Sequence, residues 1–205
     1  MKRYWVDFCV VDGEQSDLGG NLRHGDTQSI TPKLWQGLID RFAPYSVLDV
    51  GAGEGHMLSF FHRHGVISHG FDGLAFNVQN SKFPIAQHDL KNGPYRFPCD
   101  LVHCVELVEH IEEQYLDNLL GTFQNAPVVV LTHGLPGQPG HHHVNLQEQG
   151  YWVQKMDTCG YKLSIDNEKF RAIAKSENPD SYFAKSGLVF LRVLDSNRSL
   201  HGDAK

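Results

Sequence analysis

A glycine-rich turn between a short apolar strand and a helix is the feature of this sequence that most constrains its fold. The segment reads Val47-Leu-Asp-Val-Gly-Ala-Gly-Glu-Gly55. Glycine at positions 51, 53 and 55 lets the backbone turn sharply and approach a ligand closely, and the first N–H groups of the following helix are free to bind it. Such a turn is typical of open α/β sheets, in which ligands bind at the carboxyl ends of parallel strands.

The rest of the chain alternates short apolar segments with amphipathic ones. Strands separated by helices of about 10–15 residues indicate βαβ units. We therefore predict an α/β fold with a doubly wound, mostly parallel sheet between two layers of helices. The predicted strands are residues 4–11, 46–50, 66–71, 84–88, 100–104, 127–132, 161–165 and 187–194. The predicted helices are residues 32–43, 55–64, 109–123, 147–159 and 170–175, and residues 12–25 are predicted to be a loop.

The length and composition fit one domain with small additions at its ends. At 205 residues and 40% hydrophobic content, the chain can bury a sizeable core. We expect an N-terminal strand and glycine-rich loop at residues 1–30, the main domain at residues 31–195 and a polar tail at residues 196–205. No apolar run approaches the roughly 18–20 residues of a membrane span, so we expect no membrane association.

Charge and cysteine content narrow the partners and the compartment. Asp and Glu outnumber Lys and Arg by 24 to 18, and no run of five basic residues occurs, so we do not expect a nucleic-acid partner. The four cysteines form no C-x-x-C pair, and the amino terminus has no signal-peptide pattern. We therefore expect reduced thiols and a cytoplasmic location.

Two acidic residues indicate which ligand the glycine turn binds. Asp72 ends the next predicted strand, 21 residues after Gly51, where a carboxylate can accept the hydroxyls of a ribose. A dinucleotide fold needs G-x-G-x-x-G, whereas this turn reads G-x-G-x-G and places His56 at the third glycine position. Asp49 would be poorly placed beside a pyrophosphate, and it suits a ligand that carries an amine and a sulfonium. A NAD-binding oxidoreductase and a non-catalytic binding module remain the alternatives.

At this point the sequence resembles the class I S-adenosylmethionine-dependent methyltransferases. The resemblance covers roughly residues 30–193 and is carried by residues 46–55, Asp72, residues 87–90 and residues 100–111. It implies a Rossmann-like seven-stranded sheet whose last strand is antiparallel. The E-x-x-E-H pattern with a later histidine also resembles ubiquinone-pathway O-methyltransferases and small-RNA 2′-O-methyltransferases, which bind a divalent ion.

The resemblance also implies a cofactor site, position by position. Asp49, Gly51, Gly53 and Gly55 would surround the methionine part of S-adenosylmethionine, and Asp72 would hold the ribose. Asp89 and Leu90 would flank the adenine. Cys104 and Glu106 would line the transfer end of the cofactor, where the methyl group is.

A second group of polar residues follows two adjacent predicted strands. Glu106, Glu109 and His110 would project to one side if residues 106–110 were helical. His141, His142 and His143 follow the next strand. Because parallel strands end at one edge of a sheet, we expect the two groups to face each other over the methyl group of the cofactor.

Three interpretations of this group remain open. In the first, His143, His142, His110 or Glu109 takes a proton from the acceptor, and we place the catalytic residues at His143, His110 and Glu109. In the second, Glu106, Glu109, His110 and His143 bind a divalent metal. In the third, Glu109 and His110 merely begin a helix and the loop histidines are solvated.

A hydroxyl acceptor fits this group best, because it needs a base or a metal. We therefore expect O-methylation of a small metabolite or saccharide by direct methyl transfer. Nitrogen and an RNA 2′-hydroxyl are the alternative acceptors.

Overall fold

The computed structural model describes residues 8–9, 17–18, 21–22 and 26–193. The predicted tail at residues 196–205 and most of the predicted strand at residues 4–11 lie outside them. Within that strand, β1 (Phe8–Cys9) is described, and it pairs antiparallel with β2 (Asn21–Leu22). The prediction of a loop throughout residues 12–25 is wrong at β2, which forms a two-stranded sheet with β1.

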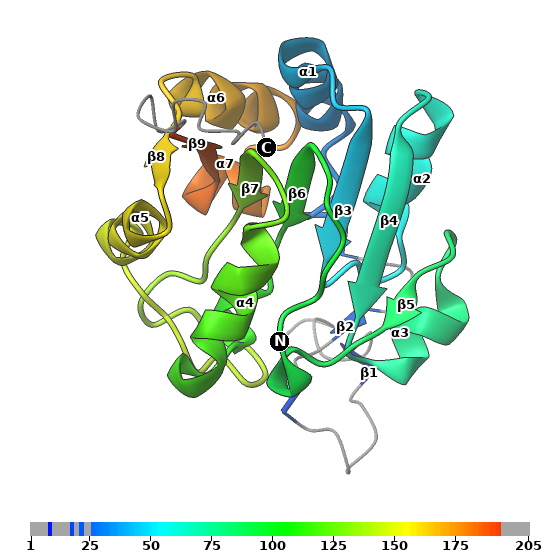
Figure 1. The fold of residues 1–205 in the computed structure, drawn as a ribbon, viewed down its shortest axis with the longest axis vertical. Helices are drawn as coiled ribbons and strands as arrows, with labels where there is room; N and C mark the ends of the chain where they lie inside the picture. Colours follow the sequence, from blue (N-terminus) through cyan, green and yellow to red (C-terminus); the bar gives the residue numbers. More distant parts are fainter. Residues whose placement is uncertain (1–7, 10–16, 19–20, 23–25, 194–205) are drawn as a thin grey trace, which may run out of the picture.

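A second, seven-stranded sheet has the strand order β5-β4-β3-β6-β7-β9-β8 and forms the centre of the molecule (Figure 1). Its last strand along the chain is antiparallel to both neighbours, and the other strand pairs of this sheet are parallel. This confirms the predicted Rossmann-like sheet. The strands are β3 (Ser46–Val50), β4 (Ile67–Asp72), β5 (Ala86–Gln87), β6 (Leu101–Cys104), β7 (Val128–Leu131), β8 (Tyr161–Leu163) and β9 (Leu188–Arg192).

Helices cover the sheet on both faces (Figure 1). Apolar side chains of α4 and α5 pack with one set of strand residues, and those of α1, α2, α6 and α7 pack with the other set. The helices are α1 (Pro32–Phe42), α2 (His56–Arg63), α3 (Ala75–Asn80), α4 (Leu116–Phe123), α5 (Gln149–Thr158), α6 (Asn167–Glu177) and α7 (Tyr182–Ser186). Because buried positions alternate along each strand, each face contributes its own half of the core. None of the described helices has the length and apolar content that crossing a membrane requires.

The prediction of one helix over residues 109–123 is wrong in its first half. Short 3₁₀ turns occupy Val108–His110 and Glu113–Tyr115, and the α-helix starts only at Leu116. The carbonyl oxygen of Glu109 accepts hydrogen bonds from the backbone N–H groups of Val144 and Asn145, both at 3.0 Å. That carbonyl therefore binds the distant histidine loop instead of continuing a helix. The sequence pattern also missed α3 and α7, which are only six and five residues long.

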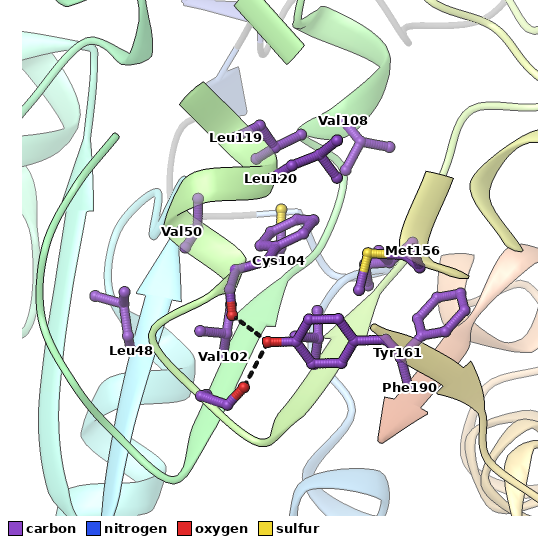
Figure 2. Close-up of a cluster of buried hydrophobic side chains, with 14 of the residues drawn as sticks. Leu48, Val50, Val102, Cys104, Val108, Leu119, Leu120, Met156, Tyr161 and Phe190 are labelled. Atoms are coloured by element: carbon purple, nitrogen blue, oxygen red, sulfur yellow. Dashed lines mark hydrogen bonds between the residues drawn. The ribbon is translucent and has the colours of Figure 1, made fainter. Parts of the chain in front are cut away.

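A buried tyrosine connects the α4 face of the core to the sheet (Figure 2). The side chain of Tyr161 on β8 is fully buried, and its hydroxyl lies 2.7 Å from the carbonyl oxygen of Phe123 and 2.6 Å from that of Ala126. These carbonyls end α4 and lead into β7. Because the hydroxyl is hydrogen-bonded, the large ring can be buried without an unpaired polar group.

The parallel register brings the ends of several strands to one edge of the sheet. Asp49 on β3 lies opposite Gly70 on β4 and opposite His103 on β6. The segments that follow β3, β4 and β6 therefore leave the sheet side by side. In open α/β sheets this edge is where ligands bind.

Candidate cofactor and acceptor site

A cavity of about 790 Å³ opens at the carboxyl edge of the parallel strands. Residues of the glycine turn, the end of β4 and the segment after β6 line it, together with residues 17–18 and 26–30. The predicted cofactor residues that line it are Asp49, Gly51, Gly53, Asp72, Asp89, Leu90 and Glu106. The structure thus brings seven of the nine predicted positions into one cavity.

The glycine turn has the backbone conformation that its sequence predicts. Gly51, Gly53 and Gly55 have φ angles of 72°, 52° and 71°, in the region that favours glycine. At Gly55, an added Cβ would lie 2.6 Å from the Ser81 hydroxyl oxygen. Gly55 precedes α2 and is not among the residues that line the cavity. Gly55 therefore lies in a turn packed against Ser81, and its contact with the methionine part of a ligand remains a prediction.

A buried pair of side chains lies behind the turn. The Nδ1 atom of His103 lies 2.8 Å from the Oδ1 atom of Asp49, and both side chains are at most 6% exposed. The pair follows from the register, because the two residues are direct neighbours on β3 and β6. His103 was not predicted as a site residue, although it is the one polar side chain inside an otherwise apolar strand. It fixes the orientation of the Asp49 carboxylate at the cavity wall.

Asp72 is buried at the end of β4 and hydrogen-bonded to the backbone. Its Oδ2 atom accepts from the N–H of Gly53 at 2.8 Å, and its Oδ1 atom accepts from the N–H of Leu74 at 2.9 Å. Burial raises the pKa of Asp72 to about 6, although these hydrogen bonds oppose the rise. Asp72 therefore joins the glycine turn to the end of the next strand.

The far end of the cavity contains the predicted adenine-flanking pair. Asp89 accepts a hydrogen bond from the backbone N–H of Lys91 at 2.8 Å, and Leu90 is buried. Lys91 forms an ion pair with Asp17, which also lines the cavity. The sequence showed no role for residues 1–30, because contacts between distant segments leave no local pattern.

The prediction that Cys104 lines the transfer end is wrong. Successive side chains of β6 point to opposite faces, and His103, Val105 and Glu106 line the cavity while Cys104 packs in the core with Val102. Burial raises the pKa of the Cys104 thiol well above its usual value. Cys104 is thus a buried apolar side chain.

Glu106 lines the cavity in a conformation that the sequence did not predict. Its φ angle is 53°, so residues 106–110 are not a continuous helix. The Thr132 hydroxyl donates to Oε1 of Glu106 at 2.8 Å and accepts from the Glu106 backbone N–H at 2.8 Å. Burial raises the pKa of Glu106 to about 7.

Glu109 is completely buried beside Glu106. Neither of its carboxylate oxygens has a hydrogen-bond partner of normal geometry in the described part of the chain. Burial, with a smaller contribution from the nearby Glu106, raises its pKa well above the usual value. A buried carboxyl group is costly to ionise, so the protonated form of Glu109 is favoured.

The structure brings two of the predicted histidines to Glu109. One possible ligand atom from each of Glu109, His110 and His143 lies within 4.8 Å of the other two. The ring centroids of His110 and His143 are 4.9 Å apart. We call these three residues the Glu–His cluster. His110 and His143 line the cavity, whereas Glu109 and His142 are not among its lining residues.

Backbone carbonyls fix the orientation of both imidazoles in the Glu–His cluster. Nδ1 of His110 lies 3.3 Å from the carbonyl oxygen of His142, and Nδ1 of His143 lies 3.1 Å from that of Gln138. A carbonyl accepts only, so each Nδ1 carries the proton and each Nε2 keeps a lone pair. Burial lowers the pKa of His110 to about 4, so this imidazole is neutral at pH 7.

The cavity wall is strongly acidic. Among the described residues that line it are eight carboxylates and one lysine, which is the Lys91 paired with Asp17. A negative wall attracts a cationic ligand and repels phosphate groups. This charge agrees with a sulfonium-bearing cofactor.

Comparison with known proteins identifies the class. Residues 27–167 match the protein family described as a methyltransferase domain. No curated protein sequence matches the chain significantly. The chain therefore belongs to this methyltransferase family, and its fold is the one found in solved S-adenosylmethionine-dependent methyltransferases.

Solved structures with low sequence identity share the fold. Magnesium protoporphyrin IX methyltransferase (ChlM) from Synechocystis PCC 6803 with bound S-adenosylmethionine has a TM-score of 0.58 and 12% identity, over 81% of this chain and 79% of that chain. A TehB-like methyltransferase from Corynebacterium glutamicum has a TM-score of 0.58 and 18% identity, over 80% and 89%. The methyltransferase domain of the bacterial protein CtHen1 has a TM-score of 0.57 and 18% identity, over 82% and 99%.

Proposed function

We propose that this enzyme methylates an oxygen atom of a small metabolite or saccharide. The observation that carries the proposal is the Glu–His cluster, in which two imidazoles with free Nε2 lone pairs border the same cavity as the glycine turn. A hydroxyl is a poor nucleophile until its proton is taken, so nitrogen atoms that can take up a proton suit a substrate that is methylated on oxygen. We also propose a cytoplasmic location, supported by the free thiols of Cys99, Cys104 and Cys159.

The cofactor would lie along the cavity with its methionine part against Asp49, Gly51 and Gly53. The ribose would lie at Asp72 and the adenine between the segments of Asp89 and Leu90. Glu106 would then lie near the sulfonium. The cofactor supplies a methyl group on a positively charged sulfur, and the acidic wall stabilises that charge.

His143 is the residue that we propose as the proton acceptor. Its Nε2 atom borders the cavity and would accept the hydroxyl proton as the acceptor oxygen attacks the methyl group in line. His110 lies beside it as a neutral imidazole, and Glu109 lies behind both. The raised pKa of Glu109 favours its protonated form, so this carboxyl group is poorly suited to act as the base.

The base assignment is tested by comparing two variants of one loop. We expect His143→Ala to lower turnover by about 10²–10⁴-fold, which is the usual contribution of a general base. His141→Ala is the matched control, because this residue follows the same strand outside the Glu–His cluster. Turnover of His143→Ala at the wild-type rate would contradict the assignment.

The acceptor is identified by screening the purified enzyme against hydroxylated metabolites, saccharides, amines and a short RNA. The readout is release of S-adenosylhomocysteine. We expect hydroxylated small molecules to be methylated, because the acidic cavity disfavours a phosphodiester backbone close to the transfer end. Turnover only with amines, or only with RNA, would contradict the proposal and identify an amine or an RNA as the methyl acceptor.

A divalent metal at the Glu–His cluster is the second candidate, and the geometry fits one. Glu109 offers a buried carboxyl group, and His110 and His143 each offer an imidazole nitrogen. In each imidazole the other nitrogen donates to a backbone carbonyl, as is usual for metal-binding histidines. A bound divalent ion would supply a Lewis acid that orients the acceptor oxygen.

Chelation separates the two candidates. If the metal is required, EDTA abolishes turnover, and titration with Mn²⁺ releases heat with the wild type but not with Glu109→Gln. Full turnover in EDTA would eliminate the metal and leave the general base. The calorimetric measurement reports binding independently of activity.

A further inference from the structure

Gln138 stands apart from its neighbours in the loop that follows β7. It is half-buried in a stretch, residues 135–141, whose other members are exposed. Its backbone N–H donates to the carbonyl oxygen of Leu135 at 2.9 Å, and its side-chain Oε1 atom accepts from the Leu135 N–H at 3.0 Å. Pro136 and Gly137, whose φ angle is 80°, occupy the central positions of this tight turn. The backbone and the side chain of Gln138 therefore hold the same turn.

Gln138 also joins this turn to two residues that line the cavity. Burial raises the pKa of Glu106, and a hydrogen bond from the side-chain amide of Gln138 opposes the rise. The Thr132 hydroxyl holds Glu106 from the other side at 2.8 Å. The carbonyl oxygen of Gln138 accepts the hydrogen bond from Nδ1 of His143 at 3.1 Å. A continuous path of hydrogen bonds therefore leads from Thr132 through Glu106 and Gln138 to His143.

The imidazole of His143 lies directly against the backbone of this loop. A Cβ added at Gly140 would overlap the His143 ring. Because the ring is packed on one side of the loop and hydrogen-bonded to its backbone, a displacement of the loop displaces the ring with it. An exposed stretch has little buried surface to hold it in place, so its hydrogen bonds to the rest of the protein matter more.

We propose that Gln138 is a positioning residue for His143, whose side-chain amide holds the loop against Glu106 so that the imidazole faces the cavity. This inference rests on the proposed function of His143 as the proton acceptor. It goes beyond that proposal because it names the contact that keeps the base in place. A misplacement of about 1 Å can cost about 10²-fold in rate, so such a contact affects catalysis without touching the reacting atoms.

The first test reads the ring nitrogens of His143 by ¹⁵N nuclear magnetic resonance at about pH 8, where histidine is neutral. In the wild type, the Gln138 carbonyl should keep the proton on Nδ1. Gln138→Met keeps the length of the side chain and removes its hydrogen bonds, so the resonances should shift toward a mixture of both tautomers. Gln154→Met is the matched control, because it makes the same change at an exposed position of α5, and it should leave them unchanged.

A pair of exchanged side chains tests whether Glu106 is the partner. Gln138→Glu can still accept from the Leu135 N–H, but it places a second carboxylate against Glu106 and should also mix the tautomers. Adding Glu106→Gln restores a hydrogen bond with the amide and the carboxylate exchanged, and it should return the proton of His143 to Nδ1. If the loop needed only a side chain of this size, no such recovery would occur.

Turnover is then measured with the acceptor that the screen identifies. Gln138→Met should lower kcat by about 10–100-fold and change the KM of the acceptor little, because it misplaces the base without removing it. The inference is overturned by unchanged His143 resonances in Gln138→Met or by no recovery in the exchanged pair. It is also overturned by wild-type kcat in Gln138→Met when His143→Ala is impaired. If His143→Ala itself keeps wild-type turnover, the base assignment fails, and the resonances alone decide whether Gln138 positions the ring.

Discussion

At the scale of the residue, burial changes the acid–base behaviour of both ends of the cavity. At the end of β4 it raises the pKa of Asp72 to about 6, and in the segment after β6 it raises the pKa of Glu106 to about 7 and lowers the pKa of His110 to about 4. In each case burial is the largest cause, because a group removed from water loses hydration of its charged form. The same physical effect therefore favours a protonatable carboxyl group and a neutral imidazole.

The raised pKa of Asp72 predicts how cofactor affinity depends on pH. The affinity for S-adenosylhomocysteine should be constant above about pH 7 and should fall as the pH drops through about 6, because the protonated carboxyl group is a weaker acceptor. Calorimetric titrations between about pH 5 and 8 measure this. Asp72→Asn cannot titrate, so its affinity should be lower and flat over that range. The same pH dependence in Asp72→Asn would assign the effect to another group.

At the scale of the element, close contact between α2 and β4 positions the glycine turn. A Cβ added at Gly70 on β4 would lie 2.6 Å from Cδ1 of Leu58 on α2 and 3.2 Å from the carbonyl oxygen of Asp49. Only a residue without a side chain lets these elements approach so closely. The helix that follows the turn is thereby held against the strand that ends at Asp72.

Two glycine-to-alanine variants should change stability in opposite directions. Gly70→Ala should lower the free energy of unfolding by about 1–3 kcal/mol, because the added methyl group overpacks the contact between α2 and β4. Gly150→Ala should raise it by about 0.4–1 kcal/mol, since this exposed position on α5 has open space for a Cβ and alanine restricts the unfolded chain. Urea unfolding of both variants measures the effects. A loss of stability in Gly150→Ala, or none in Gly70→Ala, would contradict the packing argument.

At the scale of the whole molecule, the cavity joins segments that are far apart in the sequence. The hydroxyl of Tyr182 on α7 donates to Oδ2 of Asp26 at 2.8 Å, and its backbone N–H donates to the carbonyl oxygen of Gln28 at 3.3 Å. Both Asp26 and Tyr182 line the cavity. The cavity therefore combines segments from near both ends of the described chain with the ends of the central strands.

Because these segments form the cavity only in the folded state, the cofactor product should stabilise the whole protein. At a concentration of 100 times its dissociation constant, S-adenosylhomocysteine should add about 2.7 kcal/mol. For a chain of this length, that corresponds to a rise in the melting temperature of about 5–11 °C. Differential scanning calorimetry measures the shift, with Asp72→Ala and with NADH as controls. A shift with NADH and none with S-adenosylhomocysteine would contradict the assigned cofactor.

Much of the fold and part of the site could be predicted from the sequence because their signals are local. The glycines of the turn, the apolar strands and the acidic residue at the end of β4 occupy fixed places in a βαβ unit, so the mostly parallel sheet and several cavity residues follow from them. The position of Cys104 and the first half of the helix at residues 109–123 were predicted incorrectly. The face of the sheet to which Cys104 points and the left-handed backbone conformation of Glu106 depend on contacts with other segments.

The sequence by itself determined the architecture, since periodicity and turn chemistry act over a few neighbouring residues, and the class of enzyme was indicated by the resemblance of its motifs to a known family. Only the tertiary structure decided which polar groups are buried, which of them are paired and which face one another. The pair of Asp49 and His103, the hydrogen bond between Gln138 and Glu106 and the approach of His143 to Glu109 all join residues on different elements. Such contacts arise from strand register and loop path, and no local pattern encodes them.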